Sequence, residues 1–179
     1  HEGAIAALSR IYEAEGAWVL LNGVFERELE NAAGDAAEAD IRAKLARLAS
    51  ERLNDATRAI DTWKLVLDLR GEDPEALFAL AGLYEGQQAW RELVDVLERQ
   101  HDIAESDDDR VNILTRRARV FTECLASDEL ALSDWNRVLD YDYSNLAALR
   151  AIAEIRRRED DPTELVSALH QQVDRAAAL

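Results

Sequence analysis

The sequence predicts an all-α protein, built as an α-solenoid of about five antiparallel helix pairs. Only 7 Gly and 2 Pro occur among 179 residues, and no segment shows the apolar–polar alternation of a strand. Apolar residues make up 48% of the chain, which is enough to bury a core. Finally, the sequence resembles itself after a shift of 72 residues, and helical sequence that repeats at a fixed period indicates stacked units.

The 72-residue shift aligns three separate pairs of segments. Matched residues include Leu8 and Leu80, Tyr12 and Tyr84, Trp18 and Trp90, Trp63 and Trp135, and Val66-Leu67-Asp68 and Val138-Leu139-Asp140. Leu45 lies at an equivalent apolar place about halfway between Leu8 and Leu80. We therefore interpret the shift as two units of about 36 residues, each a pair of helices.

Apolar residues three and four apart predict ten helices. The expected ranges are 4–15, 18–33, 37–52, 55–70, 74–86, 89–104, 108–126, 128–141, 144–159 and 162–177. Asp73-Pro74, Ser144-Asn145 and Asp161-Pro162 are typical of helix starts, since the polar side chain can cap the first turn. Gly34-Asp35 and Gly71 are expected to end helices. Each unit therefore has two helices with turn chemistry between them.

Large and small residues recur at fixed places in the units. Trp63, Trp90 and Trp135 are expected to fill the space between consecutive pairs. A small residue follows the Leu place of four units and would let paired helices approach closely; these residues are Ala46, Ala81, Ala118 and Ala153. The core therefore repeats along the chain rather than gathering at one centre.

Two stretches resemble the tetratricopeptide repeat, a family of helical repeats. The segments 59–63, 66–69 and 73–76 resemble its second helix and closing turn, and Leu80-Ala81 with Tyr84 resembles its first helix. A second copy of the second-helix pattern is formed by Ala131, Trp135, Val138 and Leu139. The copies are degenerate: Arg117 occupies the Leu place of the fourth unit, and the first, third and fifth units lack the closing Pro.

This resemblance implies a right-handed superhelix that covers residues 1–179 as a single repeat domain, a segment of a longer array. It also implies a protein-interaction scaffold rather than an enzyme, in which the first helix of each pair lines a concave groove. Two alternatives stay open. The chain could be a structural, self-associating segment, or the regulatory helical domain of a larger catalytic polypeptide.

Counting from each Leu place puts several cationic residues and one aromatic residue on that groove. The expected partner-binding residues are Arg10, Arg47, Phe78, Arg119, Arg150 and Arg157. Such a row predicts a protein or peptide partner with an acidic segment. The competing interpretation is that these arginines only pair with neighbouring carboxylates at the surface.

Other classes of function find little support in the composition. A formal net charge of −16 argues against nucleic acid, and no apolar stretch is long enough to predict a membrane span. No catalytic residues, cofactor or metal are predicted, since His1, His101 and His170 lack ligand spacing. Cys124 is expected to be a buried, inert thiol.

Composition also bears on the origin and the location of the protein. Basic residues are almost all Arg, which favours a high-GC, bacterial genome. The single cysteine and the lack of a visible signal peptide favour the cytoplasm.

Overall fold

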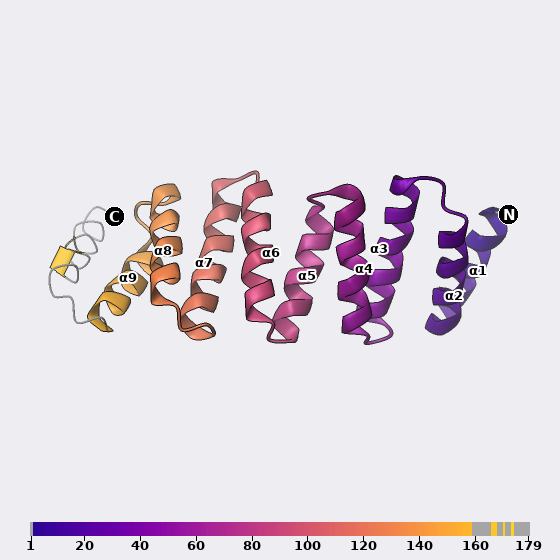
Figure 1. Cartoon of the computed structure of the whole chain (residues 1–179), viewed down its shortest axis with the longest axis horizontal. Coiled ribbons are helices and arrows are strands. Elements are labelled where there is room, and N and C mark those ends of the chain that lie inside the picture. Colours follow the sequence, from indigo (N-terminus) through magenta and orange to yellow (C-terminus); the bar gives the residue numbers. More distant parts are fainter. Residues whose placement is uncertain (1, 159–165, 168–169, 171–172, 174–179) are drawn as a thin grey trace. The chain divides into compact units, whose positions relative to one another are not determined.

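A computed structural model describes residues 2–158, 166–167, 170 and 173 of the chain. This part contains nine α-helices and no strand (Figure 1). The helices are α1 (Glu2–Glu15), α2 (Trp18–Glu30), α3 (Asp35–Glu51), α4 (Ala56–Arg70), α5 (Pro74–Gly86), α6 (Trp90–Ile103), α7 (Asp107–Glu123), α8 (Asp128–Tyr141) and α9 (Leu146–Arg158). The all-α prediction is confirmed, whereas the tenth expected helix, 162–177, falls mostly outside the described residues.

The chain divides into two compact units, residues 1–87 with α1–α5 and residues 88–179 with α6–α9. Within each unit every helix packs against the next one along the chain. Helix bounds reproduce the 72-residue repeat: α3 becomes α7 and α5 becomes α9 without a change of register. The helix-pair solenoid is therefore confirmed within each unit, and one continuous domain over 1–179 stays a prediction.

Repeated apolar positions form the core. In the first unit, one cluster joins α2 and α3 and comprises Leu21, Phe25, Ile41, Leu45 and Leu48, with Tyr12 and Trp18 packed against it. All four small residues expected between helices are buried: Ala46, Ala81, Ala118 and Ala153. The second unit buries Leu114, Val138, Leu149 and Ile155.

The tryptophans differ in burial. Trp63 and its repeat equivalent Trp135 are buried, and neither indole nitrogen has a hydrogen-bond partner among the described residues. Trp90 is only half-buried, because it is the first residue of α6. The repeat therefore buries tryptophan in the second helices α4 and α8, but less fully at the start of α6.

Helix starts follow the predicted chemistry. Asp73 Oδ1 accepts a hydrogen bond from the Ala76 amide at 2.9 Å, and Asn145 Oδ1 accepts one from Ala148 at 3.1 Å. Gly71, with φ of 77°, follows the end of α4, as expected. Gly34, with φ of 88°, instead lies immediately before α3, so its predicted place at a helix end is wrong. Its positive φ turns the chain into the new helix.

Cys124 corrects another expectation, because its thiol is exposed rather than buried. The predicted helix 108–126 begins at Asp107 and ends at Glu123, after which Cys124 forms the C-cap. Val120 and Phe121 provide the last buried apolar residues of α7, so the thiol lies where the chain leaves the core.

Candidate partner-binding surface

The six predicted partner-binding residues all lie on first helices, and all six side chains are exposed. We call them the first-helix row: Arg10 on α1, Arg47 on α3, Phe78 on α5, Arg119 on α7, and Arg150 and Arg157 on α9. The repeat explains this exposure. Arg47 follows the buried Leu45 by two residues, which places it about 200° around the helix from the core. Phe78 is 75% exposed, a high value for an aromatic side chain.

Two members of the row already have a carboxylate partner. The Arg47 guanidinium donates to both carboxylate oxygens of Glu75 on α5, at 2.5 and 3.0 Å. This hydrogen bonding, together with the charge of Glu75, raises the pKa of Arg47 against the opposing effect of burial. Arg157 donates to both oxygens of Glu154 at 2.7 and 2.6 Å, which likewise raises its pKa. For these two arginines the surface ion-pair interpretation holds.

Arg10, Arg119 and Arg150 differ from those two. None of the three forms a hydrogen bond or ion pair with another described residue. Exposed guanidinium groups without an internal carboxylate can bind one from a partner. The row therefore consists of two satisfied arginines, three available ones and the exposed ring of Phe78.

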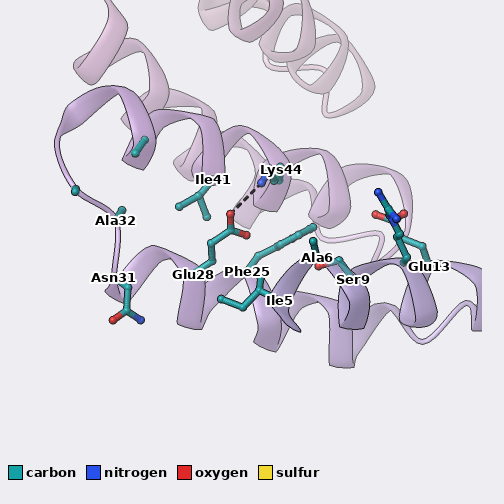
Figure 2. Close-up of a pocket in the computed structure, with 13 residues that line it drawn as sticks. Ile5, Ala6, Ser9, Glu13, Phe25, Glu28, Asn31, Ala32, Ile41 and Lys44 are labelled. Atoms are coloured by element: carbon teal, nitrogen blue, oxygen red, sulfur yellow. Dashed lines mark hydrogen bonds and ion pairs between the residues drawn. The ribbon is translucent and has the colours of Figure 1, made fainter. Parts of the chain in front are cut away.

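Arg10 also lines a groove of about 1050 Å³ between α1, α2 and α3 (Figure 2). Ile5, Phe25 and Ile41 form apolar parts of its wall, one from each helix. Lys44 Nζ on α3 donates to Glu28 Oε1 on α2 at 3.1 Å and lies 5.5 Å from the centre of the Phe25 ring. The groove therefore combines apolar contact area with a few polar groups, as ligand-binding clefts generally do.

A buried ionic network in the second unit was missed by sequence reasoning. Arg117, at the Leu place, donates to Asp134 on α8 through Nε at 2.7 Å and Nη2 at 2.5 Å. It also pairs with Glu98 on α6. One signal was present in the sequence: the 72-residue shift replaces Leu45 by Arg117 and Thr62 by Asp134, so both partners change together.

This network also accounts for one cluster with metal-ligand geometry. Ligand atoms of Glu98, His101 and Asp102 lie within 4.8 Å of one another. Arg117 and Arg137 both pair with Glu98, and Arg137 Nη2 lies 3.1 Å from His101 Nδ1. A cation at this place would face two guanidinium groups, so electrostatic repulsion favours the ion-paired arrangement. The cluster is therefore assigned to the packing of α6, α7 and α8.

None of the helices in the described part of the chain combines the length and apolar character needed to cross a bilayer. Residues 76–111 match the family model of the tetratricopeptide repeat. No curated protein sequence matches the chain.

Three solved structures with a similar fold illustrate the architecture. A MamA fragment from Desulfovibrio magneticus RS-1 superposes with a TM-score of 0.56 at 13% identity, over 98% of this chain and 95% of its own. YrrB, described as a TPR protein with an unusual peptide-binding site, gives 0.52 at 18% identity, over 84% and 74%. A tetratricopeptide repeat protein from Parabacteroides merdae ATCC 43184 gives 0.62 at 11% identity, over 98% and 66%. The chain is therefore a helical repeat protein of the tetratricopeptide type in its fold.

Proposed function

We propose that the chain is a non-catalytic interaction scaffold that binds a protein or peptide segment along the first-helix row, without a cofactor. The observation that carries the proposal is the exposure of all six row residues on first helices, three of them arginines without a partner among the residues that the structure describes. In the first unit, the groove beside Arg10 adds apolar area next to that arginine. A fold neighbour described as having a peptide-binding site supports this type of use. The cytoplasm is the proposed location, because a single exposed thiol suits a reducing compartment.

The partner is an extended acidic segment. Arg10, Arg119 and Arg150 offer planar, forked donors that match carboxylates, and Phe78 offers a ring for an apolar side chain. Within the second unit, Arg119 on α7 and Arg150 on α9 belong to successive first helices, so a linear segment meets both more readily than a compact ligand does.

A second candidate, assembly of the chain with itself, is favoured by an apolar surface on α1 and α2. Leu8 and Ile11 on α1 and Val19 and Leu20 on α2 are all exposed. Leu8 occupies the place at which Leu45 and Leu80 are buried against a neighbouring helix. Sedimentation velocity distinguishes the candidates: a concentration-dependent dimer that Leu8→Glu abolishes would support assembly.

The binding proposal is tested with peptides selected from a random display library against the whole chain. We expect acidic peptides, and we expect Arg119→Glu with Arg150→Glu to weaken their binding at least tenfold, since about 1.4 kcal/mol corresponds to tenfold. Fluorescence anisotropy of the labelled peptides measures this change.

Arg91→Glu is the matched control for Arg119→Glu alone, because each variant reverses one exposed charge and Arg91 lies on the second helix α6. Binding should also weaken from 50 to 300 mM salt, as screening of exposed charges requires. Equal losses from the control and the row variant would contradict the proposal, as would selected peptides that lack acidic residues.

A further inference from the structure

The second unit carries polar side chains at five places where the first unit has four leucines and one threonine. The 72-residue shift relates α2, α3 and α4 to α6, α7 and α8 without a change of register. We call these side chains the polar set: His101, Arg117, Asp134, Arg137 and Tyr141. Their first-unit equivalents are, in the same order, Leu29, Leu45, Thr62, Leu65 and Leu69. The set draws on all three helices of the second unit, so these helices have changed together.

Contacts within the polar set join the three helices. Arg117 on α7 donates two hydrogen bonds to Asp134 on α8, at 2.7 and 2.5 Å. Arg137 on α8 reaches α6, where its Nη2 lies 3.1 Å from His101 Nδ1, and its Nη1 lies 3.5 Å from Asp134 Oδ1. Tyr141 Oη lies 3.3 Å from His101 Nε2, and the two rings meet edge to face. Every member of the set therefore contacts another member.

The centre of the polar set is withdrawn from water. His101, Arg117 and Asp134 are 8%, 9% and 1% exposed. At the equivalent place of the first unit, Leu45 belongs to the apolar cluster of α2 and α3, and Leu29 packs against that cluster. Leucine packs against any apolar neighbour of suitable size, whereas a buried charge needs one particular partner. The second unit thus has a pairing requirement that the first unit lacks.

From this comparison we infer that the polar set is a register lock. It makes α6, α7 and α8 pair with one another and prevents them from pairing with the equivalent helices α2, α3 and α4 of another copy or of the same chain. The two units share their helix bounds and their apolar pattern, and exchange of like elements is a characteristic failure of repeat proteins. A lock of this kind acts while the scaffold folds, whatever partner the scaffold binds.

Exchange of helices between the units would leave a buried charge without its partner. If α8 packed against α3, Asp134 would face Leu45, which has no group that can donate a hydrogen bond. If α7 packed against α4, Arg117 would meet Thr62, whose hydroxyl already donates to the backbone oxygen of Arg58 at 2.7 Å. Either arrangement costs more than the loss of apolar contact, because the desolvated charge is not compensated.

Glu98 belongs to the network but does not distinguish the units. It pairs with both Arg117 and Arg137. However, the first unit also has an acid, Glu26, at the place of Glu98. An exchanged α7 would therefore still meet a carboxylate on α2, so the discrimination depends mainly on Asp134 and on the pairing of α7 with α8.

The experiment uses the whole chain in two forms, one unlabelled and one enriched in heavy nitrogen. Both forms are unfolded together in urea and refolded by dilution. Native mass spectrometry then measures dimers that contain one light and one heavy chain. A parallel mixture that is never unfolded measures ordinary reversible association, and this amount is subtracted. The remaining mixed dimers report helices that were exchanged between copies during refolding.

The decisive variant is Arg117→Leu with Asp134→Thr, which places the first-unit residues at both positions. We expect its exchanged dimers to increase about tenfold or more over the wild type, since exchange no longer leaves a buried charge unpaired. Arg119→Leu with Asp140→Thr is the matched control, because it makes the same replacements at exposed positions of the same two helices. The control should form no more exchanged dimer than the wild type. Urea denaturation checks that both variants fold.

A second variant moves the pair instead of removing it. Leu45→Arg with Thr62→Asp gives the first unit the residues of the second, so that both units carry the ion pair. Exchanged dimers should increase here as well, because α7 can now pair with α4 without leaving a charge unpaired. This variant therefore separates a difference between the units from polarity of the core as such. If it does not fold, the first variant and its control decide the question.

Equal amounts of exchanged dimer from the wild type and from Arg117→Leu with Asp134→Thr would overturn the inference. So would an equally large increase in the control, because general loss of charge would then explain the result. A folded Leu45→Arg, Thr62→Asp variant that exchanges no more than the wild type would also contradict it, since the lock requires the two units to differ.

Discussion

Arg117 is a charged residue at a place where the repeat otherwise buries an aliphatic one. Its guanidinium donates two hydrogen bonds to the carboxylate of Asp134, which is 1% exposed, so the two charges are paired away from solvent. Buried ion pairs contribute little net stability, because desolvation offsets their attraction, but losing one partner leaves a costly buried charge. The pair therefore specifies how α7 and α8 meet more than it strengthens the unit.

We expect Arg117→Leu to lower the free energy of unfolding by up to about 3–5 kcal/mol, since Asp134 stays buried and keeps only the longer contact to Arg137, at 3.5 Å. Adding Asp134→Thr should recover most of this loss, because Leu and Thr are the first-unit residues Leu45 and Thr62 at these places. Urea denaturation measures both. Arg119→Leu, two residues along and exposed, is the control and should change stability by less than about 0.5 kcal/mol. If the double variant is as unstable as Arg117→Leu alone, the loss does not come from the unpaired charge of Asp134, and the prediction is wrong.

Individual helices depend on their caps as well as on their apolar faces. The Asp73 carboxylate accepts a hydrogen bond from the Ala76 amide at the start of α5. It also accepts one from Arg70 at 3.0 Å, which joins the end of α4 to the next helix. Pro74 fixes the first residue of α5. One carboxylate thus stabilises two elements and the turn between them.

Asp73→Ala should cost about 1–2 kcal/mol, because α5 loses its cap and Arg70 loses one of its two carboxylates. Asp73→Asn should cost less than half as much, since the amide oxygen still caps the helix. Thermal unfolding followed by circular dichroism compares the two variants. Equal losses would indicate that the ion pair, not the cap, is the stabilising contact.

At the scale of the whole molecule, the helices contact their neighbours along the chain. We therefore expect a destabilising substitution to affect mainly the helices next to it. Hydrogen exchange is expected to show this in Arg117→Leu: amides of α6, α7 and α8 should exchange faster, while those of α3 and α4 keep the wild-type rates. A uniform rise in exchange along the chain would mean that both units unfold in one cooperative step.

The repeat also explains what could be predicted. Helix centres follow from apolar spacing, so α4, α5 and α8 begin and end within one residue of their expected ranges. Helix ends depend on caps and turns, which is why α2 stops at Glu30 and α7 at Glu123, three residues before expected. The exposure of the first-helix row followed from the register of each helix alone.

Pairing within that row could not be predicted in the same way. Arg157 pairs with a near neighbour, Glu154, but the partner of Arg47 lies far along the chain: it is Glu75 on α5, 28 residues away. Periodicity identifies the face on which a side chain lies but not the rotamer or neighbour that satisfies it. The Arg117 network was not predicted for the same reason. The repeat did hold a sign of it, because Arg117 and Asp134 stand where the first unit has Leu45 and Thr62.

Cys124 gives the molecule a built-in point of chemical attachment. It is the chain's single cysteine, and its exposed thiol is on the residue that caps the end of α7, five residues after Arg119, which corresponds to a backbone rise of about 7.5 Å. A maleimide dye would therefore label every molecule once, at the end of the helix that carries Arg119, without mutagenesis. Fluorescence from that one position can follow peptide capture in real time, and a quencher on the peptide would reveal in which direction the bound segment runs.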